Sequence, residues 1–460
     1  MSTMPRVSTG NREADLILEG GFPANSLNIL MGEPGTGKTL FAEQLLFSNA
    51  NGDRPVVYLT TLSEPLSKMV TYLQRFQFYD EQKLGSSVIY DDLGASLARE
   101  GPDVLLAHLR EAIETIGPKI IVIDSFKAVH DLSTSPIRMR RLVSDMAGLL
   151  SAYATTTFLV GEYRAQDVAR YPEFAVADGI IEFARQKRST TDERFVRVSK
   201  LRGSGYLEGL HGLHITSGGV EVYPRLVSPN IPVEYQLQRE RVPTGVPGLD
   251  AMLGGGLWRG STSLLMGPTG SGKTLMALQF AITGAAQGRP ALYVNFQENP
   301  TQLARVIKGL DPKGTSQPHL HLLYTSAVEL QIDKIIVDIF RLIETHKIRR
   351  VVIDAVGDLA MAAGDPQRIH DYLYALVQRF ASSGVTTLLV MEDLFHGPSG
   401  APFSAGEFTR LSYMCDNLIL LEIQRDQRLR RSISIYKTRA SGHADEVRPL
   451  TLSEQGARVE

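Results

Sequence analysis

Cysteine is almost absent from the sequence, since its 460 residues include only Cys415. One cysteine can form neither an internal disulfide nor a cysteine-rich metal site, so we expect a reducing, cytoplasmic environment. Net charge is also nearly absent, because 48 Lys and Arg balance 50 Asp and Glu, which argues against binding to duplex DNA or an anionic membrane. No apolar run approaches the roughly 18 residues of a membrane helix, and residues 1–11 lack the apolar core of a signal peptide. We therefore expect a soluble intracellular protein.

A long internal repeat organises the chain. The segment from Thr9 to Tyr58 recurs without a gap from Thr244 to Tyr293, an offset of 235 residues. Around residues 224–241, Pro, Asn, Gln and Arg replace the periodic apolar pattern, as in an exposed linker. The repeat predicts two domains, residues 1–229 and 230–460.

Short apolar runs alternate with longer amphipathic stretches in each copy, which is typical of βαβ units and a mainly parallel sheet flanked by helices. The predicted buried strands are Leu27–Met31, Val56–Thr60, Lys119–Ile123, Thr155–Val160, Ser263–Met266, Ala291–Asn295, Val351–Ile353 and Val385–Met391. Near the end of each copy, Phe195–Lys200 and Ser432–Lys437 predict antiparallel strands that extend the sheet. The predicted fold class is α/β.

Two glycine-rich motifs each follow an apolar strand and begin a helix. Gly32–Thr39 and Gly267–Thr274 both fit G-x-x-x-x-G-K-[ST]. In such a P-loop, backbone N–H groups surround the phosphates, the lysine reaches the β and γ phosphates and the hydroxyl binds Mg²⁺. Chance could explain one match, but two in register predict binding of ATP or ADP with Mg²⁺. The predicted nucleotide contacts are Gly35, Thr36, Gly37, Lys38, Thr39, Leu40, Gly270, Ser271, Gly272, Lys273, Thr274 and Leu275, with Thr39 and Thr274 as metal ligands.

An acidic residue ends one buried strand in each copy. The runs Ile120–Asp124 and Val351–Asp354 are apolar except for their last residue. Each carboxylate is placed to hold the metal, directly or through its water shell. The alternative is an aspartate that only caps the following helix.

P-loops, terminal aspartates and tandem duplication together resemble the KaiC family of tandem RecA-like ATPases, from Thr9 to about Leu452. The turns Lys200-Leu201-Arg202 and Lys437-Thr438-Arg439 look like the Lys-x-Arg element that, in that family, reaches the nucleotide of the neighbouring subunit. The resemblance implies two RecA-like P-loop NTPase domains and a homo-hexamer, single or stacked, with ATP at the subunit interfaces. Without the resemblance, these turns read as solvated basic turns.

The catalytic carboxylates depart from the family pattern, in which a Glu-Glu pair follows the second strand of each domain. The second copy has Gln297 and Glu298 at these positions. The first copy has Leu62 and Ser63, with Glu64 one step later. We expect Glu298 to polarise the attacking water, with Gln297 beside it. If the strand end of the first copy is shifted by one residue, Glu64 is placed to do the same, with Ser63 beside it. Otherwise the first domain binds ATP and hydrolyses it slowly. Both glutamates also fit a structural role near a helix N-terminus.

Autophosphorylation is a further activity that the resemblance implies. The family's adjacent Ser-Thr phosphosites precede an aspartate that begins an apolar strand. Here Ser412 and Tyr413 stand at the matching positions before Asp416, whereas the first copy has Phe174 and Ala175. Ser412 is the expected site and Tyr413 a weaker candidate, although a serine before a strand often has no such role.

Three functions remain open. The first is a ring-forming signalling or clock-like ATPase, with possible autokinase activity, whose state an unidentified protein partner reads. The second is a nucleic-acid motor with the same core, against which stand the neutral charge and the lack of an aromatic and basic strand-binding stretch. The third is a scaffold ring that ATP stabilises with little turnover.

Overall fold

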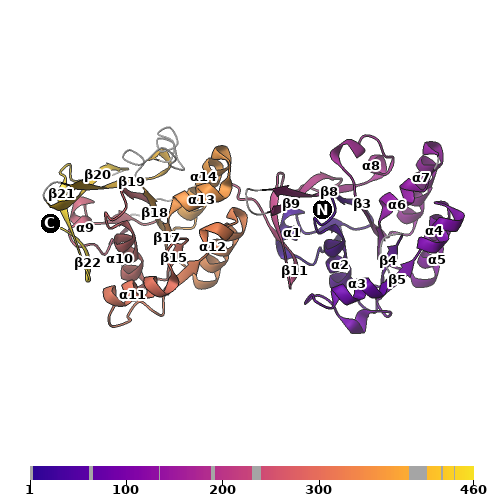
Figure 1. Cartoon of the computed structure of the whole chain (residues 1–460), viewed down its shortest axis with the longest axis horizontal. Coiled ribbons are helices and arrows are strands. Elements are labelled where there is room, and N and C mark those ends of the chain that lie inside the picture. Colours follow the sequence, from indigo (N-terminus) through magenta and orange to yellow (C-terminus); the bar gives the residue numbers. More distant parts are fainter. Residues whose placement is uncertain are drawn as a thin grey trace. The chain divides into compact units, whose positions relative to one another are not determined.

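The computed structural model describes residues 4–61, 66–133, 135–187, 192–229, 240–392, 412–425, 428–439 and 441–460. The chain divides into two compact units, Met1–Arg225 (unit 1) and Leu226–Glu460 (unit 2) (Figure 1). Leu226 is buried in the core of unit 2. None of the helices in the described part of the chain has the length and apolar composition that a bilayer span requires.

Unit 1 contains a nine-stranded sheet with the order β11-β10-β9-β8-β3-β7-β6-β4-β5. The strands from β8 to β5 in this order pair in parallel, and β9, β10 and β11 extend the sheet in antiparallel fashion. Their bounds are β3 Leu27–Gly32, β4 Val56–Thr60, β5 Val88–Asp92, β6 Ile120–Asp124, β7 Thr156–Gly161, β8 Gly179–Lys187, β9 Asp192–Leu201, β10 His211–Thr216 and β11 Gly219–Tyr223.

Unit 2 repeats this topology with the order β16-β15-β17-β18-β14-β19-β20-β21-β22. The strands from β16 to β19 are parallel, and the last three are antiparallel. Their bounds are β14 Thr262–Gly267, β15 Ala291–Asn295, β16 Leu320–Tyr324, β17 Arg350–Asp354, β18 Thr386–Glu392, β19 Asn417–Arg425, β20 Leu429–Thr438, β21 Arg448–Ser453 and β22 Gly456–Val459. The predicted α/β class and the antiparallel extensions are confirmed.

Helices cover both faces of each sheet. In unit 1, α1 Arg12–Ile17, α2 Lys38–Asn49 and α3 Leu66–Leu73 contribute to one apolar cluster, and the other contains residues of α4 Gly94–Glu100, α5 Val104–Ile116, α6 Phe126–Asp131, α7 Pro136–Ala152 and α8 Glu173–Val176. In unit 2 the corresponding sets are α9 Leu249–Met252, α10 Lys273–Ala286 and α11 Pro300–Leu310, and α12 Ile332–His346, α13 Val356–Ala363 and α14 Pro366–Ser382. Short elements complete the fold: β1 Arg6–Val7, β2 Phe22–Pro23, β12 Arg241–Val242, β13 Leu257–Trp258, η1 Glu81–Lys83, η2 Ala165–Asp167 and η3 Ala327–Glu329.

Burial on both faces explains why the central strands are continuous apolar runs rather than alternating ones. In β6, Ile121 and Ile123 belong to one apolar cluster, while Ile120 and Val122 belong to the other. A parallel strand covered by helices on both sides needs apolar side chains at every position. Every predicted strand is present, with ends displaced by at most three residues. The strands β5 and β16, which form the parallel edge of each sheet, were not predicted from the sequence.

Candidate nucleotide-binding sites

Each P-loop lies at the carboxyl end of its central strand, between β3 and α2 in unit 1 and between β14 and α10 in unit 2. Gly35 and Gly37 have φ angles of 74° and 102°, and Gly270 and Gly272 have 82° and 105°. Residues with side chains rarely adopt these angles, so the glycines permit the curled backbone that a phosphate cradle requires. A helix begins directly after each P-loop, so its N-terminal N–H groups also point toward the phosphate position.

The P-loop lysines bend back over their own loops. Lys38 Nζ donates to Glu33 O at 2.8 Å, and Lys273 Nζ donates to Gly267 O at 2.7 Å and Pro268 O at 3.0 Å. Burial lowers the pKa of Lys38, while the nearby carboxylates of Glu162, Asp124 and Glu33 oppose this shift. A buried ammonium beside a loop of main-chain donors fits a polyphosphate anion.

A hydroxyl, a carboxylate and a phenol form the same cluster in both units. Asp124 Oδ2 accepts hydrogen bonds from Thr39 Oγ1 at 2.7 Å and from Tyr58 OH at 2.7 Å. Asp354 Oδ2 accepts from Thr274 Oγ1 at 2.9 Å and from Tyr293 OH at 2.6 Å. The structure thus brings together the two residue types that the sequence predicted for Mg²⁺ binding. The tyrosines have the same place in the repeat, but no role was predicted for them.

Oxygen donors of this kind suit Mg²⁺, which is held in such sites by few protein ligands together with phosphates and water. Burial raises the pKa of Asp124, and the bonds from Thr39 and Tyr58 lower it in part. Burial also raises the pKa of Asp354, opposed by Tyr293 and Thr274. Among the described residues, no group of three or more His, Cys, Asp or Glu forms a metal site by itself. The threonine and aspartate oxygens of each cluster fit a Mg²⁺ ion that phosphates and water also bind.

Replacing Tyr293 by phenylalanine tests whether this phenol supports Asp354. Asp354 would keep one donor instead of two, so we expect unit 2 to lose about 1 kcal/mol of stability. Thermal unfolding of the full chain, with Tyr436→Phe as the matched control, measures this. Tyr436 is 70% exposed, so its replacement should leave the unfolding temperature unchanged. Equal shifts in both variants would contradict the assignment.

Two further carboxylates lie beside the P-loops, and neither was predicted from the sequence. Glu162 directly follows β7, which lies between the P-loop strand β3 and the aspartate strand β6. Its charge acts on both Lys38 and Asp124. Glu392 ends β18 at the corresponding place and accepts a hydrogen bond from Thr269 of the P-loop. A charged residue at the end of a buried strand next to the P-loop strand was the available signal.

An arginine from the first antiparallel strand also contacts each P-loop. Arg194 Nε donates to Gly35 O at 3.1 Å, and Arg431 Nε donates to Gly270 O at 2.8 Å. These guanidinium groups add positive charge near the phosphate cradle. No spacing rule links them to the motif, because β9 and β20 are far from the P-loops in the sequence.

The predicted catalytic residues of unit 2 follow β15. Glu298 is half-buried, and burial together with the charge of Asp354 raises the pKa of its carboxyl. Gln297 Nε2 donates to both oxygens of Asp358, at 3.0 and 3.1 Å. In unit 1, the predicted residues Ser63 and Glu64 lie outside the described residues.

The Lys-x-Arg turns lie at the opposite end of the sheet from their own P-loops. In the register of the sheet, Lys200 on β9 pairs with Ile180 on β8, and Ile180 pairs with Ile29 on β3. The P-loop begins three residues further along β3, at Gly32, and continues away from Lys200. With about 3.3 Å per strand residue, the separation along the strands is on the order of 10 Å. Lys437 pairs with Leu418 in the same way. Neither turn is therefore placed to complete its own nucleotide site.

Contacts within the chain hold these turns in place. Lys200 Nζ lies 3.5 Å from Phe174 O, and Lys437 Nζ donates to Ser412 O at 2.8 Å and Cys415 O at 2.9 Å. Arg202 and Arg439 pair with Asp178 and Asp416, at 3.6 and 3.7 Å. Leu201 is buried in the core of unit 1, which leaves only its main chain to face a ligand.

The predicted phosphosites lie beside the second Lys-x-Arg turn. Ser412 and Tyr413 belong to a short helical turn before β19. Arg439 donates to the carbonyl oxygen of Tyr413, and Lys437 to that of Ser412. The Tyr413 side chain is 68% exposed. Any nucleotide that these cations reach would thus lie near Ser412.

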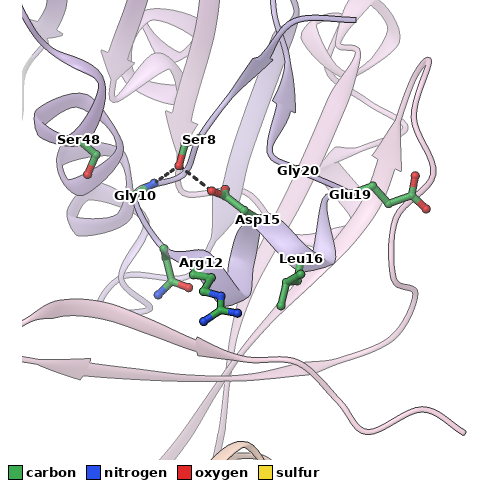
Figure 2. Close-up of a pocket in the computed structure, with 9 residues that line it drawn as sticks. Ser8, Gly10, Arg12, Asp15, Leu16, Glu19, Gly20 and Ser48 are labelled. Atoms are coloured by element: carbon green, nitrogen blue, oxygen red, sulfur yellow. Dashed lines mark hydrogen bonds between the residues drawn. The ribbon is translucent and has the colours of Figure 1, made fainter. Parts of the chain in front are cut away.

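A separate surface depression of about 700 Å³ lies on unit 1 around the turn before α1 (Figure 2). Asp15 lines it, but this carboxylate already accepts hydrogen bonds from Ser8 Oγ at 2.6 Å and from Thr9 N at 2.8 Å. The depression includes no P-loop residue, and its polar groups close a turn. It is therefore not the nucleotide site. Its lining consists of Ser8, Gly10, Asn11, Arg12, Asp15, Leu16, Glu19, Gly20 and Ser48.

Comparison with known proteins agrees with this duplicated architecture. A family model described as the KaiC ATPase matches residues 7–227 and 242–460, and so covers nearly all of both units. The chain belongs to the KaiC family. The resemblance inferred from the P-loops, the aspartates and the repeat is thus confirmed.

Curated relatives align along nearly the whole chain. The circadian clock oscillator protein KaiC of Picosynechococcus sp. is 26% identical over 97% of this chain and 87% of its own length. The circadian clock oscillator protein KaiC of Thermostichus vulcanus is 28% identical with the same coverage. The circadian clock protein KaiC2 of Synechocystis sp. is 26% identical over 97% of this chain and 80% of its own length.

Proposed function

We propose that this KaiC-family chain binds ATP with Mg²⁺ in both units and hydrolyses it as a ring, with the nucleotide between neighbouring subunits. The duplicated cluster of P-loop threonine, strand aspartate and tyrosine carries this proposal. A buried carboxylate held by two donors beside a buried lysine has a direct purpose in a site for a phosphate-bound cation. As part of a core alone it would cost free energy.

Glu298 is the proposed general base of unit 2. Its raised pKa and its place beside Asp354 suit a group that accepts the proton of the attacking water. Lys273 and the P-loop N–H groups bind the phosphates, and Thr274 and Asp354 would hold Mg²⁺. When bound, this ion supplies charge neutralisation of the phosphates. In unit 1, Glu64 keeps the corresponding role as a prediction.

The distance between each Lys-x-Arg turn and its own P-loop supports the proposed ring. Cations at the amino end of the sheet cannot serve a nucleotide at the carboxyl end of the same sheet. In a ring with repeated head-to-tail contacts, the turn of one subunit can meet the P-loop of the next. Lys437 and Arg439 would then act as an arginine finger does, completing charge neutralisation only on assembly. Ser412, held beside them, is the proposed phosphate acceptor.

Mixing two inactive variants tests both hydrolysis and its location between subunits. All chains carry Lys38→Ala, so that phosphate release reports unit 2. Lys273→Ala and Arg439→Ala should each abolish release, but mixed rings should recover about a quarter of the parent activity, because some interfaces combine an intact P-loop with an intact arginine. Lys273→Ala mixed with Glu298→Gln is the control and should stay inactive, since both changes affect the P-loop side of the interface.

The outcomes separate the competing functions. If the control mixture also recovers phosphate release, Lys273 and Glu298 do not belong to the same side of the subunit interface. A parent chain that binds ATP and assembles but releases no phosphate would refute hydrolysis in unit 2 and favour a nucleotide-stabilised scaffold. Mass spectrometry of the same samples tests Ser412 for phosphate. A Ser412 that carries no phosphate after ATP turnover would refute its role as phosphate acceptor.

A further inference from the structure

A buried carboxylate faces the position where the KaiC resemblance leads one to expect a glutamate. Asp358 lies in the first turn of α13 and is 5% exposed. Both of its oxygens accept a hydrogen bond from Gln297 Nε2, at 3.0 and 3.1 Å. The offset of 230 residues that relates Asp354 to Asp124 relates Asp358 to Ala128. Unit 1 therefore has no counterpart of this pair.

This contact decides which way the amide of Gln297 points. An ionised carboxylate can only accept hydrogen bonds, so the NH₂ group of Gln297 must face Asp358. Oε1 is bonded to the same carbon as Nε2 and is consequently directed elsewhere. Among the described residues none donates a hydrogen bond to it. Gln297 thus offers an acceptor atom on its side away from Asp358.

The loop that carries Gln297 is anchored at the edge of the nucleotide site. Asn295 Oδ1 accepts from the N–H groups of Gln297 at 3.2 Å and of Glu298 at 3.1 Å, and Asn295 Nδ2 donates to Glu298 O at 2.6 Å. Asn295 pairs directly with Asp354 across β15 and β17. The loop geometry is therefore set by the same strand ends that place the proposed metal and base residues.

Asp358 also gives a physical reason for glutamine rather than glutamate at position 297. A glutamate in the same rotamer would bring a second carboxylate about 3 Å from that of Asp358, and two such groups cannot both stay ionised without a large penalty. Asp354 already experiences the charge of Asp358. An amide removes the conflict and uses the buried anion as its acceptor.

We propose that Asp358 is a positioning residue that orients Gln297, so that Gln297 Oε1 aligns the attacking water while Glu298 accepts its proton. This inference rests on the proposed ATP hydrolysis in unit 2. Gln297 touches the reacting water in this arrangement, and Asp358 acts only through Gln297. The contact therefore still contains one carboxylate, but Asp358 supplies it and position 297 supplies an amide.

Exchanging the two side-chain chemistries tests the proposal in the full chain carrying Lys38→Ala. Gln297→Glu alone should lower kcat by about tenfold or more, because orienting residues contribute factors of this order. Asp358→Asn alone should lower kcat several-fold with little change in KM, because the amide of Gln297 is no longer held one way. The double variant restores one amide and one carboxylate in contact and should recover most of the lost kcat.

Asp371→Asn is the matched control, since Asp371 is an exposed residue of α14 and its change should leave kcat unaltered. A gain of activity in Gln297→Glu would overturn the proposal, because a simple missing base would then explain the glutamine. Additive losses without recovery in the double variant would overturn it as well. An Asp358→Asn variant with a lower unfolding temperature but an unchanged kcat would also overturn the proposal, because the contact would then serve only stability. These results require turnover in the parent, whereas a parent without turnover refutes the proposed function itself and this inference with it.

Discussion

Lys273→Ala is expected to lower the affinity of unit 2 for ATP with Mg²⁺ by about 100-fold, which corresponds to about 2.7 kcal/mol. The ammonium of Lys273 lies over the P-loop, held by the carbonyls of Gly267 and Pro268. A bound phosphate would replace these weak neutral acceptors by charged ones, and charge-assisted bonds of this kind contribute roughly twice as much as neutral ones. Alanine removes this charge but leaves the glycine backbone of the loop intact.

Calorimetric titration can assign the loss to one unit, because the chain contains two P-loops. The parent should bind two nucleotides per chain, and Lys273→Ala and Lys38→Ala should each remove one of them from the measurable range. Lys308→Ala is the matched control, since Lys308 is exposed on α11. Two sites of unchanged affinity in Lys273→Ala would show that its P-loop does not bind the phosphates.

Glu43→Gln is expected to remove a strong pH dependence from the stability of unit 1. Glu43 lies on α2 and is fully buried, and its Oε2 accepts a hydrogen bond from Tyr90 OH at 2.5 Å. Among the residues that the structure describes, none forms a hydrogen bond with its Oε1. Burial raises the pKa of Glu43 to about 8, partly offset by the Tyr90 bond and reinforced by the charge of Asp124. At the same place in the repeat, unit 2 has Leu278.

The sign of this pH dependence follows from whether the folded or the unfolded chain releases the Glu43 proton at the lower pH. The unfolded chain loses the Glu43 proton near its ordinary pKa of 4.5, whereas the folded chain retains it until about pH 8. Stability should therefore fall as pH rises between these values, by about 5 kcal/mol in total. The glutamine variant keeps an acceptor for Tyr90 but does not titrate. It should exceed the parent in stability by less than about 1 kcal/mol at pH 5 and by several kcal/mol at pH 8.

Thermal unfolding of nucleotide-free protein from pH 5 to 9, combined with amide hydrogen exchange in α2, measures this effect in unit 1. Glu111→Gln on the exposed face of α5 is the control and should follow the parent at every pH. A parent and a Glu43→Gln variant with parallel curves would show that Glu43 is ionised in the folded protein. The prediction would then be wrong.

Several site residues were predictable because their signals are local. The P-loop glycines are recognisable by their spacing. The strands β3, β6, β14 and β17 are recognisable as continuous apolar runs that end at a P-loop or at an aspartate. Tyr58 and Tyr293 were visible in the repeat but carried no signal of their contact with the aspartates. Glu162 and Arg194 each reach the site from an element far away from the P-loop in the sequence, so no spacing rule relates them to it. Asp358 follows Asp354 by four residues, but its contact with Gln297, 61 residues away, leaves no signal in the sequence.

The amino-acid sequence by itself determined the duplication, the α/β class, the two P-loop motifs and the family. These properties follow from periodic burial and from short motifs in which neighbouring residues do the work. Only the tertiary structure decided which side chains meet at the cradles, why Gln297 faces Asp358, and that each Lys-x-Arg turn lies at the far end of the sheet from its own P-loop. These depend on strand order and register, which arise from pairing between distant segments and are not encoded in any one of them.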